Sequence, residues 1–263
     1  MTIVLLVPPL EPGDDRPALI LFPYAGSGAL AYRGWAAELS DLAGVTTVLL
    51  PGREQLFGEP LLRSMPEVLH RLMPLITEVG PRPVVLFGHS MGAAIAFGLA
   101  RELRRRAAPA AALIVSGAGS PCRRDRHKLA HRLDDGAFAQ HVIDYGGMPP
   151  ELLADPDATA LFLPILRADF QLLETWAVER QPPLDIPVTV LRGTDDATVT
   201  DHQIDGWAEH VAGPPVVHTV VGGHFFLHTA RAEVMTTIRR TLTLVSRGRG
   251  SRHPADRGHG HSR

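Results

Sequence analysis

The chain has 263 residues and a single cysteine, Cys122. One thiol excludes a disulfide framework within the chain and a zinc site built from several cysteines, and it suits a reducing cytoplasm. No apolar run is long enough to span a bilayer. The apolar start, residues 1–10, lacks a basic segment and meets Pro8 and Pro9, so it does not resemble a signal peptide. We therefore expect a cytoplasmic protein without a membrane segment.

An excess of charge of either sign is also missing. The formal net charge is −2 and 21% of the residues are charged, so bulk electrostatics gives no basis for binding nucleic acid. With 45% hydrophobic residues the chain can bury a large core, and its length is typical of one α/β domain. We expect a single domain over residues 1–245.

The last residues, 246–263, are rich in Gly, Arg and His, and we expect a disordered tail there. The histidines His253, His259 and His261 could bind a metal ion non-specifically, but a solvated tail without function is the simpler interpretation. No clustered metal ligands occur elsewhere in the sequence. We expect neither a metal nor a cofactor.

Short apolar segments alternate with helical patterns along most of the chain. Strands are predicted at residues 18–22, 46–50, 84–87, 111–116, 188–191 and 216–221, and helices at residues 32–39, 65–79, 91–105, 202–210 and 232–245. Strands that are apolar on both faces and alternate with helices indicate a parallel sheet that is covered on both sides. The predicted fold class is α/β, with a mostly parallel central sheet and helices on both faces.

The segment from about residue 122 to residue 180 interrupts this alternation. It carries helical patterns at residues 138–145 and 161–176 and no clear strand. Because it is inserted between two predicted strands, we expect a helical lid over the carboxyl edge of the sheet. A simple run of crossover helices is the alternative.

The pentapeptide Gly88-His89-Ser90-Met91-Gly92 follows a predicted strand and opens a predicted helix. This Gly-x-Ser-x-Gly elbow holds a serine on a strained strand-to-helix turn, where its hydroxyl can act as a nucleophile. Glycine at both flanks avoids side chains where the strand and the helix pack closely. The pentapeptide alone is a weak signal, and its context makes it a strong one. Ser90 is the predicted nucleophile.

A serine nucleophile needs a base, and the base needs an acid that orients it. In an α/β hydrolase the chain order is serine, then the acid, then histidine. Asp195 and Asp196 follow the predicted strand 188–191, in a loop at the active edge of the sheet. Either is a candidate acid, and both could instead be turn or helix-cap residues.

The candidate base is His224. It follows the predicted strand 216–221 and the pair Gly222-Gly223, which permits a tight loop. His218 lies within the strand and His228 lies beyond the loop, so both are poorer candidates.

The transition state of acyl transfer needs two backbone N–H groups that bind the oxyanion. One is expected from Met91, the residue after the nucleophile, at the positive end of its helix. The other is expected from Ala25, in the loop 22–28 that follows the first strand, because its glycines let the backbone approach a ligand. A plain Gly-rich turn is the alternative for this loop.

Taken together, these residues resemble the type II thioesterases of polyketide and nonribosomal peptide biosynthesis, which belong to the α/β-hydrolase superfamily. The resemblance covers about residues 19–245. The matching pieces are Leu21-Phe22-Pro23-Tyr24-Ala25-Gly26, Leu50-Pro51-Gly52-Arg53-Glu54 with Gly58-Glu59-Pro60, Phe87-Gly88-His89-Ser90-Met91-Gly92-Ala93, Arg167-Ala168-Asp169-Phe170 with Glu174-Thr175, Gly193-Thr194-Asp195-Asp196, and Gly223-His224-Phe225-Phe226-Leu227. The chain departs from the family pattern at Ser27, Gln55, Trp176-Ala177 and Ala197, none of which carries a catalytic atom.

The resemblance implies roles for several of these residues. The acid of the family stands at the last position of Gly-x-x-Asp, which selects Asp196 over Asp195. The oxyanion amides map to Ala25 and Met91. The implied reaction is hydrolysis of acyl groups from the phosphopantetheine thiol of an acyl or peptidyl carrier protein, which removes stalled or wrong acyl units. An acyltransferase or cyclase, a general carboxylesterase and a non-catalytic binding module are the alternatives.

The carrier protein is the expected partner, and we expect the enzyme to act as a monomer. Two basic clusters could meet the phosphate and the acidic helix of a carrier: Arg101, Arg104, Arg105 and Arg106, then Arg123, Arg124, Arg126 and Lys128. The simpler interpretation is that these cations end a helix and line a solvated face.

Overall fold

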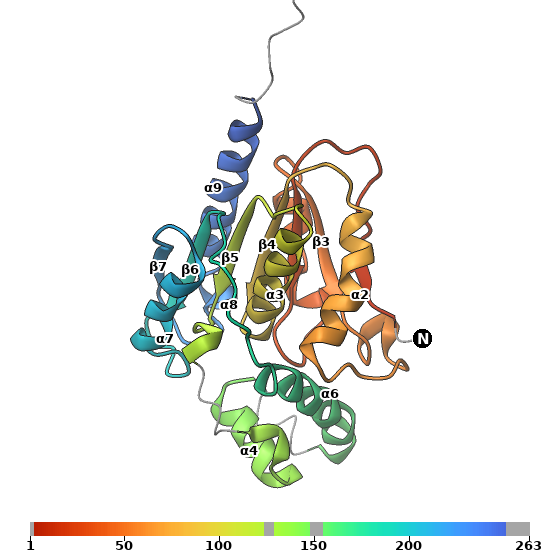
Figure 1. The fold of residues 1–263 in the computed structure, drawn as a ribbon. Coiled ribbons are helices and arrows are strands. Elements are labelled where there is room, and N and C mark those ends of the chain that lie inside the picture. The colour runs from red at the N-terminus through yellow and green to blue at the C-terminus, as the bar shows by residue number, and fades with distance from the viewer. Residues whose placement is uncertain (1–2, 124–128, 148–154, 251–263) are drawn as a thin grey trace, which may run out of the picture.

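A computed structural model describes residues 3–123, 129–147 and 155–250. These residues contain one seven-stranded sheet with the order β1-β3-β2-β4-β5-β6-β7 (Figure 1). The strands are β1 (Leu5–Val7), β2 (Ala18–Phe22), β3 (Gly44–Leu49), β4 (Val84–His89), β5 (Ala112–Ser116), β6 (Val188–Gly193) and β7 (Val216–Val220). β1 pairs with β3 in the antiparallel sense, and all the other neighbours are parallel. The predicted α/β fold class is confirmed.

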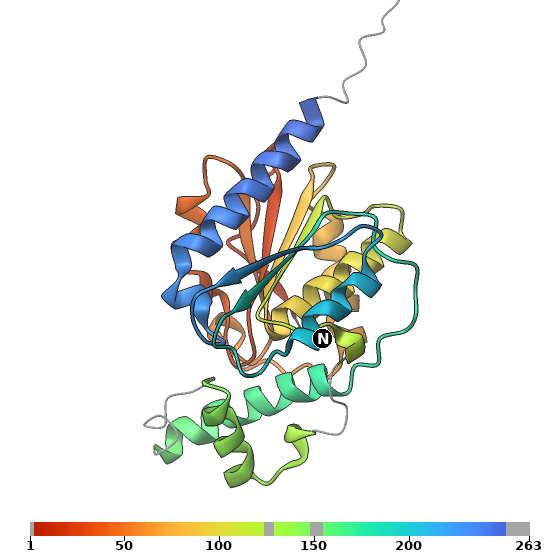
Figure 2. The same cartoon turned by 90° about the vertical axis from the view of Figure 1, so that its left-hand side faces the viewer.

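Helices cover both faces of the sheet (Figure 2). On one face lie α2 (Met65–Thr77), α3 (Met91–Arg105), α7 (Asp201–Asp205) and the 3-10 turn η5 (Gly206–His210), and on the other lie α1 (Trp35–Glu38), α8 (Phe226–Thr229) and α9 (Arg231–Gly250). In the central strand β4, Leu86 packs into the core of the first face and Phe87 into that of the second. This alternation explains why the strand is apolar throughout.

The described part of the inserted segment contains the helices α4 (Asp135–Asp144) and α6 (Pro156–Glu174) and the short turn η4 (Ala130–Arg132). Each helix begins at an aspartate whose side chain accepts from backbone amides of the first turn, Asp134 for α4 and Asp155 for α6. The helices pack around a small core of their own that includes Phe138 and Leu166. They lie together beside one end of the sheet, at the bottom of Figure 1.

Several elements differ from the sequence-based prediction, among them the helix predicted at residues 202–210, which is divided into α7 and η5. The short edge strand β1 was not predicted. The helix predicted at residues 32–39 is broken into the 3-10 turn η1 (Ala29–Tyr32) and α1, because Gly34 between them has a positive φ of 83°. The helix α9 continues to Gly250, so the tail predicted from residue 246 is wrong for residues 246–250. The cation Arg247 favours the carboxyl end of a helix.

The rest of the predicted tail, residues 251–263 with its three histidines, lies outside the described residues. None of the helices within the described ranges combines the length and the apolar character needed to cross a bilayer.

The central strand gives a test of the core. We expect Leu86→Ala to lower the free energy of unfolding by about 2–5 kcal/mol and Phe87→Ala by about 3–5 kcal/mol, because each leaves a cavity on one face of the sheet. Urea denaturation measures both values. The matched control is Leu244→Ala on α9, a side chain that is 59% exposed, for which we expect a change within about 0.5 kcal/mol. Equal losses for the three variants would contradict this assignment of the core.

Candidate active site

Ser90 lies on the turn between β4 and α3, with φ 54° and ψ −115°. A positive φ is strained for a residue that has a side chain, and such strain is typical of functional sites. The Ser90 amide donates to the Ser116 carbonyl of β5 at 2.8 Å, which ties the turn to the neighbouring strand.

The glycines on either side of Ser90 allow this turn. A Cβ on Gly88 would lie 2.1 Å from the Gly92 carbonyl oxygen, and a Cβ on Gly92 would lie 1.9 Å from the Phe22 carbonyl oxygen. Since neither distance is possible for a real side chain, β4, α3 and the end of β2 can meet only with glycine at both positions.

The loops after β6 and β7 bring a histidine and an aspartate to Ser90. His224 Nε2 lies 3.0 Å from Ser90 Oγ, and His224 Nδ1 lies 2.8 Å from Asp196 Oδ2. His224 and Asp196 are both buried. Asp195 is exposed, and its backbone amide donates to the Gly222 carbonyl at 2.9 Å. Of the two candidate aspartates, Asp196 therefore reaches His224, whereas Asp195 joins the two loops.

Thr198 completes this arrangement and was missed in the sequence. Its amide and its hydroxyl donate to Asp196 Oδ1 at 3.0 and 2.6 Å, and the hydroxyl also lies 3.0 Å from His224 Nδ1. The signal in the sequence was an aspartate followed two residues later by threonine, which is typical of an aspartate that bonds the backbone of its own loop.

The surroundings of Asp196 hold it in the charged form. Burial opposes ionisation, but the hydrogen bond and charge of His224, together with the two bonds from Thr198, outweigh it and lower the pKa of Asp196 below its usual value. The carboxylate can therefore orient His224 and stabilise its cation.

A second histidine, His89, lies under the site. Its Nδ1 is 2.9 Å from Ser116 Oγ, its Nε2 is buried without a hydrogen-bond partner, and its ring centroid is 5.2 Å from that of His224. Burial holds the pKa of His89 well below its ordinary value, and the nearby His224 lowers it further. His89 is therefore neutral beside the catalytic candidate.

A small cavity of about 40 Å³ connects the predicted site residues. It is lined by Ser90, His224, Ala25 and Met91, and on the side of the insertion by Val142, Tyr145, Leu166 and Phe170 among others. The amides next to Ala25 are already engaged, since Gly26 N donates to Asp169 Oδ2 at 2.8 Å and Ser27 N donates to the Tyr24 carbonyl at 3.1 Å. The structure thus places Ala25 and Met91 at the same cavity as Ser90.

A larger groove of about 470 Å³ also reaches Ser90, from another side. Its walls are the loop 117–120 after β5, the loop 197–200 after β6, and the insertion residues Tyr145 and Phe170. Ser90 therefore borders both the small, mainly apolar cavity and this larger groove.

The other histidines singled out by sequence have different positions. His228 Nε2 lies 3.0 Å from the Tyr24 hydroxyl, behind the loop that carries Ala25. Burial raises the pKa of Tyr24 and, together with the charge of Arg231, lowers that of His228. His218 lies within β7. Across residues 3–123, 129–147 and 155–250, no three His, Cys, Asp or Glu side chains form a group that could hold a metal ion.

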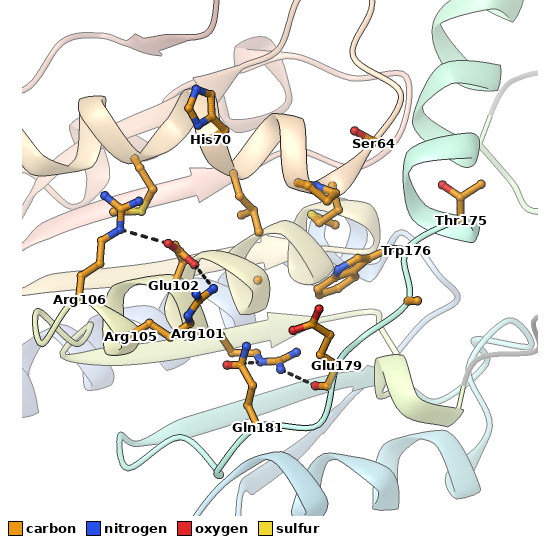
Figure 3. A pocket seen from close by; sticks show the side chains of 16 residues that line it. Ser64, His70, Arg101, Glu102, Arg105, Arg106, Thr175, Trp176, Glu179 and Gln181 are labelled. Carbon is orange, nitrogen blue, oxygen red and sulfur yellow. Dashed lines mark hydrogen bonds and ion pairs between the residues drawn. The ribbon is translucent and has the colours of Figure 1, made fainter.

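The basic residues at the end of α3 are largely engaged within the molecule (Figure 3). Arg101 donates to the Glu179 carbonyl and to Gln181, while Arg105 and Arg106 bond Glu102. They line a groove of about 630 Å³ between α2 and the segment 175–181, away from Ser90.

The second basic cluster is only partly described. Arg123 pairs with Glu209 at 2.5 Å. Arg124, Arg126 and Lys128 lie outside the described residues.

Comparison with known proteins places this geometry in a family. The family described as "Thioesterase domain" matches residues 17–242. Linear gramicidin dehydrogenase LgrE of Brevibacillus parabrevis is 32% identical over 241 residues, which cover 90% of this chain and 92% of LgrE. Thioesterase PikA5 of Streptomyces venezuelae is 32% identical over 232 residues, which cover 88% of this chain and 82% of PikA5. The structure of the type II thioesterase BorB from the borrelidin biosynthetic cluster aligns with a TM-score of 0.79 and 31% identity, over 91% of this chain and 97% of BorB.

The mostly parallel sheet and the serine elbow after β4 define an α/β hydrolase. The family match goes one step further: the chain belongs to the thioesterase family, and it is a serine thioester hydrolase. The resemblance to type II thioesterases that the sequence indicates is confirmed by these relatives.

The hydrogen bond between Asp196 and His224 gives a direct test of the acid. We expect Asp196→Asn to lower kcat by about 10³- to 10⁴-fold, because an amide favours the wrong tautomer of the histidine. Asp195→Asn is the matched control and is expected to leave kcat within about threefold, since the side chain is exposed and changes of this kind are usually small. Steady-state thioester hydrolysis measures both. The reverse order of effects would assign the acid to Asp195.

The neutral state of His89 predicts a pH dependence of stability. As the pH falls below 6.5, the ordinary value, the unfolded chain protonates His89 and the folded chain does not. The free energy of unfolding should therefore fall with pH, with a slope that approaches about 1.4 kcal/mol per pH unit for this group. Urea denaturation at pH 7, 6 and 5 should show a smaller slope for His89→Asn than for the wild type. Every other residue is the same in both proteins, so identical slopes would mean that His89 is charged in the fold.

Proposed function

We propose that this enzyme hydrolyses acyl thioesters from the phosphopantetheine arm of an acyl or peptidyl carrier protein. The observation that carries the proposal is the continuous hydrogen-bonded line from Ser90 through His224 to Asp196, at a cavity that Ala25 and Met91 also line. Nucleophile, base, acid and oxyanion donors are the parts that acyl transfer requires.

The reaction has two halves. In the first, Ser90 Oγ attacks the thioester carbonyl carbon while His224 Nε2 takes the hydroxyl proton. The amides of Ala25 and Met91 donate to the oxyanion that forms. The tetrahedral adduct then expels the thiolate, which receives the proton from His224. A thiol has a pKa of about 8.5 and is a good leaving group, so this protonation is undemanding.

In the second half, His224 takes a proton from water, and the resulting hydroxide attacks the carbonyl carbon of the acyl-serine. The same two amides bind the second oxyanion. Collapse breaks the bond to Ser90 Oγ, which takes the proton back from His224, and the free acid leaves. Asp196 stays ionised throughout and keeps the Nδ1 proton of His224 directed away from Ser90.

The insertion that contains α4 and α6 acts as a lid in this proposal. The cavity under it holds about 40 Å³, whereas pockets for ligands of drug size hold about 300 Å³ or more. An acyl chain can therefore enter only if helices of the insertion move outward. The open groove on the other side of Ser90 is roomy enough for the narrow phosphopantetheine arm.

The names of the relatives support a place in natural-product biosynthesis. BorB belongs to the borrelidin cluster and LgrE is named for linear gramicidin. By analogy, we place this enzyme beside an assembly line whose carriers become blocked by wrong or stalled acyl units. An acyltransferase or a cyclase would use the same residues, and the form of the product distinguishes them from a hydrolase.

One relative, LgrE, is named a dehydrogenase. The sequence Gly26-Ser27-Gly28 follows β2, as a dinucleotide-binding loop would, but it opens the four-residue turn η1 instead of a helix whose amino end meets a pyrophosphate. In addition, Glu54 Oε1 occupies the space beside Gly28 where a phosphate would approach. The loop therefore favours hydrolysis over hydride transfer.

The proposal is tested by incubating the enzyme with a panel of acylated carrier proteins and following both partners by intact-protein mass spectrometry. We expect loss of the acyl mass from the carrier, release of free acid, and a transient acyl adduct on Ser90. Ser90→Ala should abolish the adduct and lower turnover by about 10⁴-fold or more.

The matched control is Ser64→Ala at the start of α2, away from the site, which should behave as the wild type. A lactone product would support a cyclase, and faster turnover of oxygen esters than of carrier thioesters would support a carboxylesterase. A fluorophosphonate label that survives Ser90→Ala would contradict Ser90 as the nucleophile.

A further inference from the structure

A buried ion pair joins the insertion to the body of the enzyme. Arg53 follows β3 and Asp169 lies in α6, 116 residues further along the chain. Arg53 Nη1 and Nη2 donate to Asp169 Oδ2 and Oδ1 at 2.8 and 2.9 Å, so the guanidinium binds the carboxylate in a bidentate manner. Asp169 is 1% exposed and Arg53 6%. A pair this buried is strongly coupled, because removing one partner leaves the other as an uncompensated charge.

Both members of the pair also bind the loop that contains Ala25. Asp169 Oδ2 accepts from the Gly26 amide at 2.8 Å, and Arg53 Nη1 donates to the Ser27 carbonyl at 3.0 Å. The neighbour of Arg53, Glu54, accepts from the Leu30 amide at 3.0 Å with its Oε1. Charged side chains thus hold the loop at Gly26 and Ser27 and the following turn at Leu30.

Helix α6 also packs against the loop that contains Ala25. Gly26 has a φ of 77°, and a Cβ on it would lie 2.6 Å from Leu166 Cδ2 of α6. The peptide plane between Ala25 and Gly26 is therefore fixed by a hydrogen bond on one side and by helix packing on the other. This peptide is attached to the Cα of Ala25, which lines the cavity beside Ser90 and whose own N–H belongs to the preceding peptide.

We propose that Asp169, held by Arg53, is a positioning residue for the oxyanion hole: its bond to the Gly26 amide fixes the peptide that follows Ala25 and thereby the position of Ala25, whose N–H is the proposed donor. The inference rests on the proposed function of Ala25. In this proposal the geometry of the oxyanion hole depends on the β2 loop, the β3 loop and α6 together. The oxyanion hole is complete only while the part of α6 that carries Asp169 remains in contact with the β2 loop. Any opening motion of the insertion must therefore involve other parts of the insertion.

The proposal predicts a loss that is specific to the transition state. Asp169→Asn replaces the carboxylate by a neutral side-chain amide that has one oxygen. That oxygen cannot accept from Nη1 and Nη2 of Arg53 and from the Gly26 N–H together. We expect kcat to fall by about 10- to 100-fold, the size of effect that a shift of about 1 Å has on a positioned group, while KM changes by less than about threefold, because the acyl cavity is retained. Arg53→Lys should give a similar but smaller loss, since an ammonium lacks the planar fork.

Two inhibitors separate positioning from mere loss of structure. A trifluoromethyl ketone analogue of an acyl-pantetheine forms a tetrahedral adduct with Ser90 whose oxygen occupies the oxyanion hole. The corresponding thioether binds the cavity without an oxyanion. Asp169→Asn should weaken the ketone by about 10- to 100-fold and leave the affinity of the thioether unchanged. Equal weakening of both would mean that Asp169 is only structural and would overturn the proposal.

Arg167→Gln is the matched control on the same helix. Arg167 donates to the His131 and Leu133 carbonyls and pairs with Asp135, all within the insertion. Its loss should loosen the insertion and leave the ratio of ketone to thioether affinity at the wild-type value. A ratio as low as that of Asp169→Asn would overturn the proposal.

A double variant covers the case in which Asp169→Asn does not fold. Arg53→Met with Asp169→Leu replaces the buried pair by apolar groups of similar size, a change that often preserves stability. We expect a folded protein with a Tm near that of the wild type and with ketone affinity still reduced. Recovery of both Tm and ketone affinity would overturn the proposal. A wild-type enzyme that neither deacylates carriers nor binds the ketone would instead contradict the proposed function itself.

Discussion

The close approach of three backbones at the serine elbow is the constraint on which the site depends. The end of β2, the turn after β4 and the first turn of α3 come so near that glycine is needed at Gly88 and Gly92. The strained conformation of Ser90 between them directs its hydroxyl away from the sheet and leaves the amides of the first turn of α3 beside it. Because this contact fixes β2 against β4, it also fixes the starting point of the loop that carries Ala25.

Charge around the elbow is arranged so that a single cation can form there. Asp196 is ionised, with its Oδ1 bonded by Thr198 and its Oδ2 by His224, which fits it to stabilise an imidazolium. His89, with its ring 5.2 Å from that of His224, is kept neutral by burial. A charged His89 would repel the cation that His224 becomes during the reaction, so an apolar environment for one histidine favours proton uptake by the other.

Local sequence signals predicted the parts of the site that sit at the ends of strands. Ser90, Asp196 and His224 each follow an apolar segment, and the structure brings them together as expected, although the choice of Asp196 needed the family resemblance. Thr198 left only the weak signal of its spacing from Asp196. Arg53 and Asp169 could not be paired by any local rule, because 116 residues separate them and each alone reads as an ordinary charged residue. The break at Gly34 was missed because its flanking residues keep a helical pattern.

The Arg53–Asp169 pair has a consequence for exchange of parts between thioesterases. The insertion looks like a module that could be replaced to change the acyl group accepted, since it has its own small core. Yet α6 carries one half of a buried charge pair whose other half follows β3. A chimaera whose foreign insertion lacks an aspartate at the position of Asp169 therefore leaves Arg53 as a buried, unpaired charge unless the β3 loop is replaced as well. The natural boundary of the exchangeable unit is not continuous in the chain: it comprises two segments that must be inherited together.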